Sequence, residues 1–355
     1  MKISESEMFN AAKDHYLGNL IEDSPELSIS LDSFVGEQFS EFTRRKIRGR
    51  TIIYQSKGLK SDSLFFSFVN SPSNIEFCMK ISMPYTLGTL MDEPMNLSMH
   101  LAHSVQLVTH AHYTAFMHEQ ERNRALNPII EPLGVKIHIS VLENPQNEPI
   151  LKFPSIISFT KWIEQGSLDN YLRLNKLSLH EFLDKSSRLV EALDYMHSNQ
   201  IIFCDLKPQN LFVDQGIIKI SDFDCVYCPF IGNFNKSSEP FQGTRGFAAT
   251  EQLFGHCNAY SPSTDVFGLA ATLYYLISGE YPYKVSDDDS QNRLESCKPI
   301  DFKDLVPDAP EKLNSIFSKS FEIASNDRPL SILEFYHEVV DATRDFNPPL
   351  IFNKK

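Results

Sequence analysis

In the first part of the chain, apolar and polar positions form short runs of the kind found in strands. From about Thr51, runs rich in β-branched and aromatic residues are bounded by Gly, Ser, Asn or Pro, and they predict an antiparallel sheet. These runs lie at 51–54, 64–69 and 75–83, and further strand-like runs lie at 135–142 and 155–163. A helical segment over 96–126 separates the third run from the fourth, and a short amphipathic helix is predicted over 5–21.

After Gly166 the apolar positions adopt the 3.6-residue spacing of helices. Helices are predicted over 179–197, 266–278, 313–321 and 332–340. The uncharged apolar stretch between Asp265 and Glu280 has only 14 residues, whereas spanning a bilayer takes about 20. It therefore predicts a buried helix, and we expect no membrane span. A β-rich unit thus precedes a helix-rich unit, and the join falls near 161–167.

Composition and charge narrow the class of protein. Of the 355 residues, 42% are hydrophobic and 22% are charged, which is typical of a folded globular protein. The net charge of -13 would repel a phosphate backbone, so no nucleic-acid partner is expected. The first nine residues include Glu5 and Glu7 and no apolar core of a signal peptide. We therefore expect a cytoplasmic protein, with secretion into another cell's cytosol as the alternative.

The cysteines and histidines do not predict a metal site. Six cysteines are too sparse for a disulfide framework, and Cys225 and Cys228, which form a C-x-x-C pair, have no second paired cluster. Packing thiols are favoured over a redox pair or zinc ligands. The five clustered histidines make no H-E-x-x-H pattern and are expected on solvated helix faces; they are His100, His103, His110, His112 and His118.

The chemistry is concentrated in residues 201–224, which read I-I-F-C-D-L-K-P-Q-N-L-F-V-D-Q-G-I-I-K-I-S-D-F-D. Two strand-like runs at 211–213 and 217–220 meet at Gly216 and predict a hairpin, which brings Asn210 and Asp222 to one end. Asp205 and Lys207 lie just upstream. Carboxylates that converge with an amide and a lysine suit a polyphosphate bound through Mg²⁺, because Mg²⁺ prefers oxygen ligands.

The string D-L-K-P-Q-N followed by D-F-D resembles the catalytic loop and metal-binding motif of eukaryotic-type serine/threonine protein kinases. Residues 243–251, G-T-R-G-F-A-A-T-E, resemble the end of a kinase activation segment, and Asp265 lies where the family's long second-lobe helix begins. N-D-R-P at 326–329 resembles the late arginine motif, so Glu251 and Arg328 are predicted to form a buried ion pair. The resemblance covers about residues 50–342.

This resemblance implies a bilobed α+β kinase fold that uses ATP and Mg²⁺ on a protein substrate. The implied organisation is an N-terminal extension at 1–49, an N-lobe at 50–161, a C-lobe at 162–345 and a tail at 346–355. Asp205, Lys207 and Thr244 are the implied catalytic residues, and Asn210 and Asp222 the implied metal ligands. Lys80 would grip the phosphates, oriented by Glu119, with Glu121 as the alternative. The remaining implied nucleotide contacts are Gly58, Thr160 and Trp162.

Several positions depart from the family pattern. In the loop at 58–66, where the family has a glycine-rich loop, Lys60 and Ser63 stand in place of glycines. Asp224 replaces the glycine of D-F-G, and Phe203 and Cys204 replace the usual His and Arg before the catalytic Asp. Cys204 cannot bind a phosphate on the activation segment, so activity is expected without phosphorylation of Ser237 or Ser238.

These departures leave two alternatives to a serine/threonine kinase. One is a pseudokinase that acts as a scaffold or binding module. The other is a kinase-fold enzyme that phosphorylates a small molecule or transfers AMP. Partner binding is expected through 1–50 or 91–112.

Overall fold

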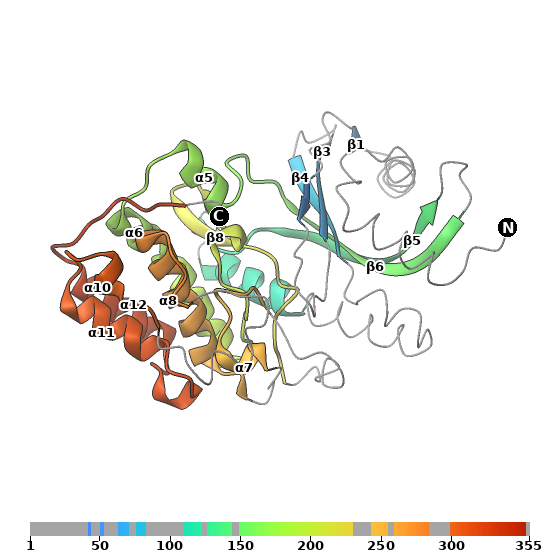
Figure 1. Ribbon diagram of the computed structural model, residues 1–355. Helices are drawn as coiled ribbons and strands as arrows, with labels where there is room; N and C mark the ends of the chain where they lie inside the picture. The colour runs from blue at the N-terminus through green and yellow to red at the C-terminus, as the bar shows by residue number, and fades with distance from the viewer. Residues whose placement is uncertain are drawn as a thin grey trace. The chain divides into compact units, whose positions relative to one another are not determined.

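The structure is a computed structural model that describes residues 42–43, 50–52, 63–70, 76–82, 110–122, 126–143, 149–229, 243–254, 259–283 and 299–352 (Figure 1). The helix predicted at 5–21, Gly58, Ser237 and Ser238 lie outside the described residues, as does most of 91–112. The chain divides into two compact units, Met1–Thr109 with Glu131–Trp162, and His110–Ile130 with Ile163–Lys355. The four-part division implied by the sequence remains a prediction.

The first unit holds the predicted antiparallel sheet. Its described strands run in the order β1-β3-β4-β6-β5, and β2 pairs with β3. Every pairing is antiparallel. The strands are β1 (Phe42–Thr43), β2 (Arg50–Ile52), β3 (Ser63–Asn70), β4 (Glu76–Ser82), β5 (Pro132–Glu143) and β6 (Pro149–Lys161).

Strand β6 begins six residues before the predicted start at Ser155 and continues through Pro154. A proline usually ends a central strand because it has no N–H for the ladder. Here the pairing of β6 with β4 stops at Ile156, while its pairing with β5 continues past Pro154, which lies opposite Ile139. Among the described strands, β6 therefore has a partner on one side only at Pro154, and a missing N–H can be tolerated there.

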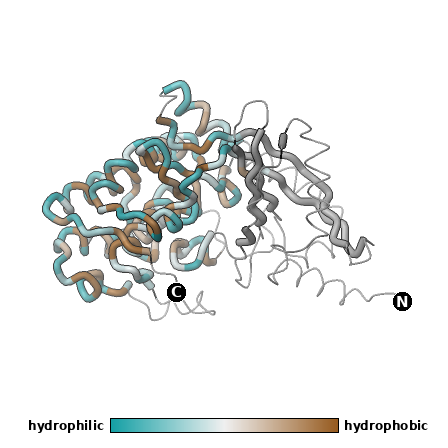
Figure 2. The backbone as a smooth tube through the Cα atoms, turned by 90° about the horizontal axis from the view of Figure 1, so that it is seen from above, coloured by the Kyte–Doolittle hydropathy of each residue, from teal (hydrophilic) through white to brown (hydrophobic). Residues whose placement is uncertain are grey.

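The second unit is mainly helical. It contains a helix over 110–122. In Figure 2, brown and teal segments alternate along much of this unit, as expected where one face of a helix is buried and the other faces solvent. The helices are α5 (Leu168–Leu174), α6 (Leu179–Ser198), α7 (Thr250–Leu253), α8 (Pro262–Ser278), α10 (Phe302–Leu305), α11 (Glu311–Ser320) and α12 (Ile332–Ala342). Shorter elements are the 3-10 turns η2 (Pro208–Asn210) and η5 (Ser325–Asp327) and the hairpin β7 (Leu211–Asp214) and β8 (Ile217–Ile220).

Helix α8 is the centre of this unit. All of its residues from Ser263 to Ile277 are buried, and it contacts α6, α11 and α12. A helix that is apolar on all sides is stable only inside a core, so the predicted buried helix is found. Gly268 allows a close approach, because a Cβ there would lie 3.2 Å from the Cβ of Leu206, between the predicted catalytic residues Asp205 and Lys207.

Among the described residues, no helix is both long and apolar enough to cross a membrane.

Candidate active site

The β7–β8 hairpin forms as predicted and brings two site residues together. Leu211 lies opposite Ile220, and Gly216 in the turn has φ +82, a conformation that suits glycine. The N–H of Ser221 donates to the carbonyl of Asn210 at 3.1 Å. Asp222 follows immediately, so Asn210 and Asp222 flank the same end of the hairpin.

Asp205, Lys207 and Thr244 form one hydrogen-bonded cluster, although Thr244 lies 39 residues from Asp205 in the chain. Lys207 Nζ donates to Asp205 Oδ2 and to Thr244 Oγ1, each at 2.6 Å. Thr244 Oγ1 in turn donates to Asp205 Oδ1 at 2.8 Å. Asp205 and Lys207 are both buried, so each charge is compensated by the other.

The oxygen atoms beside this cluster fit a hard cation. Asn210 Nδ2 donates to the Asp205 carbonyl and to Asp205 Oδ2, both at 2.9 Å. Its Oδ1 is therefore an amide oxygen close to the Asp205 carboxylate. Asp222 adds carboxylate oxygens and has φ +73, an uncommon backbone conformation for a residue with a side chain. Amide and carboxylate oxygens are the ligands that Mg²⁺ prefers.

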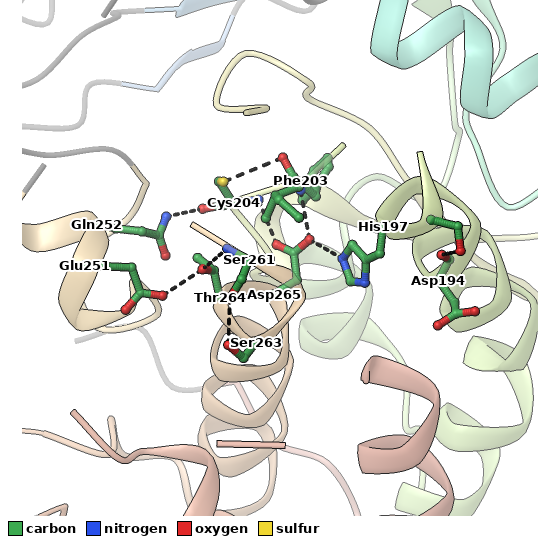
Figure 3. Close-up of polar contacts among 12 residues, drawn as sticks. Asp194, His197, Phe203, Cys204, Glu251, Gln252, Ser261, Ser263, Thr264 and Asp265 are labelled. Atoms are coloured by element: carbon green, nitrogen blue, oxygen red, sulfur yellow. Dashed lines mark hydrogen bonds and ion pairs between the residues drawn. The ribbon is translucent and has the colours of Figure 1, made fainter. Parts of the chain in front are cut away.

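The backbone before Asp205 is held from the core by Asp265 (Figure 3). Asp265 Oδ2 accepts from the N–H of Phe203 and from His197 Nε2, and Oδ1 accepts from the N–H of Cys204, each at 2.8 Å. Asp265 is not the N-cap of its helix, because α8 begins three residues earlier at Pro262 and its N-cap is Ser261. Asp265 instead braces the catalytic loop.

Glu251 and Arg328 form the predicted buried ion pair. Arg328 Nη1 and Nη2 donate to Glu251 Oε1 and Oε2, each at 2.9 Å. Arg328 Nε also donates to the carbonyl of Glu322 at 2.6 Å, and its guanidinium lies 5.1 Å from the centre of the Phe267 ring. Thr264 donates to Glu251 Oε1 at 2.7 Å, which ties the pair to the first turn of α8.

His112 contradicts the expectation of a solvated histidine. It is 5% exposed, its ring stacks on that of Phe223 with centroids 4.3 Å apart, and its Nε2 lies 2.8 Å from the carbonyl oxygen of Ile130. Burial lowers the pKa of His112 to about 4, so the ring is neutral at pH 7. Phe223 also meets Phe203 edge to face at 5.3 Å. The helix over 110–122 therefore packs directly on the residue after Asp222.

The predicted nucleotide-binding residues lie in both units. Glu119 is buried in the second unit, with its Oε1 3.2 Å from His118 Nδ1 and 3.6 Å from Arg122 Nη1, whereas the rival Glu121 is exposed. In the first unit, Lys80 in β4 lies opposite Ser158 of β6, and Thr160 lies opposite Cys78. Trp162 follows β6 directly.

Two polar residues of this region were missed by sequence reasoning, His197 and Gln252. His197 supports Asp265, and Gln252 Nε2 donates to the carbonyl of Cys204 at 2.6 Å. The only sequence signal for these residues is position: His197 lies at the end of α6, and Gln252 directly follows Glu251. The four cysteines in the described part of the chain, Cys78, Cys204, Cys225 and Cys228, are free thiols, and Cys204 and Cys225 lie in an apolar cluster. Burial raises the pKa of the Cys225 thiol, which keeps it protonated.

Comparison with known proteins supports the resemblance to protein kinases. Residues 151–337 match the protein kinase domain family. The RAF proto-oncogene serine/threonine-protein kinase of Xenopus laevis is 25% identical over 205 residues, which are 54% of this chain and 32% of that protein. The carbon catabolite-derepressing protein kinase of Secale cereale is 31% identical over 172 residues, 45% of this chain and 32% of that protein. The matched region thus spans about a third of the length of these curated relatives.

A solved structure extends the likeness in fold. The structure of the Cydia pomonella granulovirus kinase, PK-1, aligns with a TM-score of 0.50 at 18% identity and covers 89% of this chain and 98% of that chain. The predicted α+β kinase fold is therefore confirmed. Because the protein kinase domain family matches more than half of the sequence, this chain belongs to the protein kinase family.

Proposed function

We propose that this chain transfers the γ-phosphoryl group of ATP, with Mg²⁺, to serine or threonine hydroxyls of protein substrates. The observation that carries the proposal is the cluster of Asp205, Lys207 and Thr244, with Asn210 beside it. The matched region covers only part of the kinases named above, so the activity of the whole protein belongs to this proposal.

Asp205 has the geometry to orient an acceptor hydroxyl. Its Oδ2 receives hydrogen bonds from Lys207 and Asn210, while its Oδ1 receives one from Thr244. A carboxylate oxygen accepts about two hydrogen bonds, so Oδ1 can accept one more, from the substrate hydroxyl. Asp205 then holds that hydroxyl toward the transferring phosphoryl group and takes its proton.

Lys207 supplies positive charge on the acceptor side of the reaction. Its Nζ lies 2.6 Å from both Asp205 Oδ2 and Thr244 Oγ1, so its position is fixed by two side chains from separate segments. An ammonium group held in this way stabilises negative charge that develops on the transferring group. The Lys207 and Thr244 pairing resembles the serine/threonine branch of the family, which is the reason to propose those acceptors.

Asn210 and Asp222 would hold the metal ion through amide and carboxylate oxygens. When bound, Mg²⁺ neutralises charge on the phosphates and orients them. We propose that Lys80 contacts the phosphates and that Glu119 orients Lys80, after exchanging its present contacts with His118 and Arg122. The other proposed nucleotide contacts are Gly58, Thr160 and Trp162.

Labelled ATP tests this proposal against both alternatives. The purified protein is incubated with Mg²⁺ and mixed histones, a basic substrate that suits its net charge of -13. One reaction contains ATP labelled at the γ position and the other contains ATP labelled at the α position. Transfer to protein from the γ position alone is expected. Transfer from the α position would indicate AMP transfer, and no transfer to protein would favour a scaffold or a kinase of small molecules.

A further inference from the structure

Cys204, the residue before Asp205, is held in an unfavourable backbone conformation. Its φ of +68 is uncommon for a residue with a side chain and persists only where the surroundings fix it. Its N–H donates to Asp265 Oδ1 at 2.8 Å, and its carbonyl accepts from Gln252 Nε2 at 2.6 Å. The peptide groups on both sides of Cys204 are therefore fixed by buried side chains from other segments.

Gln252 is itself fixed in one orientation. It lies in α7, is 1% exposed, and its Oε1 accepts from the N–H of Ala249 at 2.9 Å. An N–H can only donate and a carbonyl can only accept, so a flipped amide would lose both contacts. Figure 3 shows this side chain directed from α7 at the carbonyl of Cys204.

The contact between Gln252 and Cys204 also supports Thr244. Gly243 has φ +106 and lies directly against the contact, since a Cβ on it would lie 2.8 Å from Gln252 Nε2 and 3.1 Å from the Cys204 carbonyl oxygen. Thr244 follows and donates to Asp205 Oδ1. A shift of Gln252 would therefore disturb both segments that supply the Asp205, Lys207 and Thr244 cluster.

The side chain of Cys204 carries no charge that could hold the two segments together. It lies in a cluster with Ile202 and Tyr260, against which Cys225 and Tyr227 are packed. The bond to its carbonyl comes from a neutral amide, so it depends neither on a phosphate nor on a titrating group.

We propose that Gln252 is a positioning residue that joins the end of the activation segment to the catalytic loop and keeps Asp205 and Thr244 in register without phosphorylation. The expected effect on kcat rests on the proposed kinase activity, but the coupling of the two segments can be measured separately.

Two variants separate the hydrogen bond from the space that Gln252 fills. Gln252→Met keeps the length of the side chain and removes the donor. We expect kcat to fall by about 10- to 100-fold, since small displacements of catalytic groups cost rates of this order, while KM for ATP stays unchanged. Gln252→Glu keeps the acceptor for Ala249 and can donate only when protonated. Its activity relative to wild type should therefore fall as the pH rises through the raised pKa of a buried carboxyl group.

Tyr336→Phe is the matched control, because it removes another buried hydrogen bond between distant segments, from Tyr336 Oη to the carbonyl of Leu183 at 2.5 Å. This control should lower the melting temperature and leave kcat unchanged. Wild-type kcat in Gln252→Met would overturn the proposal. So would equal losses of kcat in Gln252→Met and Tyr336→Phe, which would indicate a general effect on stability.

Hydrogen exchange tests the coupling even if the wild type transfers no phosphoryl group. In Gln252→Met, we expect faster exchange in both 204–207 and 243–248 than in wild type, with no change in α12. If the wild type transfers no phosphoryl group, the proposed function is refuted. Unchanged hydrogen exchange in both segments of Gln252→Met would instead refute the role of Gln252.

Discussion

Removal of the Arg328 guanidinium should destabilise the second unit strongly. Arg328 is 2% exposed and makes a two-pronged ion pair with Glu251. Its guanidinium also donates to the carbonyls of Glu322 and Ile323, at 2.6 Å and 2.8 Å. In Arg328→Met, the Glu251 carboxylate and two backbone carbonyls would lose these donors together.

The structure sets the size of this effect. Breaking a buried ion pair on one side costs about 3–5 kcal/mol, because the remaining charge is left without compensation. The two lost carbonyl contacts place Arg328→Met at the upper end. A loss of 1 kcal/mol lowers the melting temperature of a domain of 150–250 residues by about 2–4 °C. At this upper end, about 5 kcal/mol, the expected decrease is therefore about 10–20 °C.

Thermal and urea unfolding measure this change, and Arg344→Met is the control. Arg344 pairs with Asp341 at 2.6 Å, but the two side chains are 75% and 52% exposed. Loss of that pair should cost less than about 1 kcal/mol. Adding Glu251→Gln to Arg328→Met should recover part of the loss, because the stranded charge is gone. Equal melting temperatures for Arg328→Met and Arg344→Met would refute the reasoning.

Three further predictions follow from the site. In the unfolded chain His112 has its ordinary pKa of 6.5 and binds a proton below that pH, whereas in the folded state its pKa of about 4 keeps the ring neutral. The free energy of unfolding should therefore fall by about 2 kcal/mol between pH 7 and pH 5. An equal fall in His112→Phe would contradict this prediction. Glu119→Gln and Lys80→Met should each lower kcat/KM for ATP by about 10- to 100-fold, and additive losses in the double variant would exclude their pairing. Initial rates should be the same for wild type, phosphatase-treated wild type and the Ser237→Ala, Ser238→Ala double variant; a loss of about tenfold in both treated samples would show that phosphorylation is required.

The sequence predicted the parts of the site that depend on local order. The hairpin forms because a glycine separates two short apolar runs, and it places Asn210 and Asp222 at one end whatever surrounds it. The start of α8 was also readable, since Ser261 followed by Pro262 is a typical N-terminus of a helix. The expected start at Val266 came from apolar spacing alone and missed that signal.

Contacts between distant segments could not be predicted from local pattern. His112 has the sequence environment of a solvated histidine, and only tertiary packing places it against Phe223. Gln252 is likewise an ordinary polar residue until the carbonyl of Cys204, 48 residues away, lies within hydrogen-bonding distance. The start of β6 is likewise not set by local pattern, because the missing N–H of Pro154 matters only where β6 pairs on both sides.

The central claim is that Asp205 orients the acceptor hydroxyl in phosphoryl transfer, and single-turnover transfer from γ-labelled ATP by Asp205→Asn tests it most directly. We expect the rate to fall by about 10²- to 10⁴-fold in protein that still folds and binds ATP, although its melting temperature should decrease because Lys207 loses its buried charge partner. Transfer at the wild-type rate by a folded, ATP-binding Asp205→Asn protein would contradict the claim.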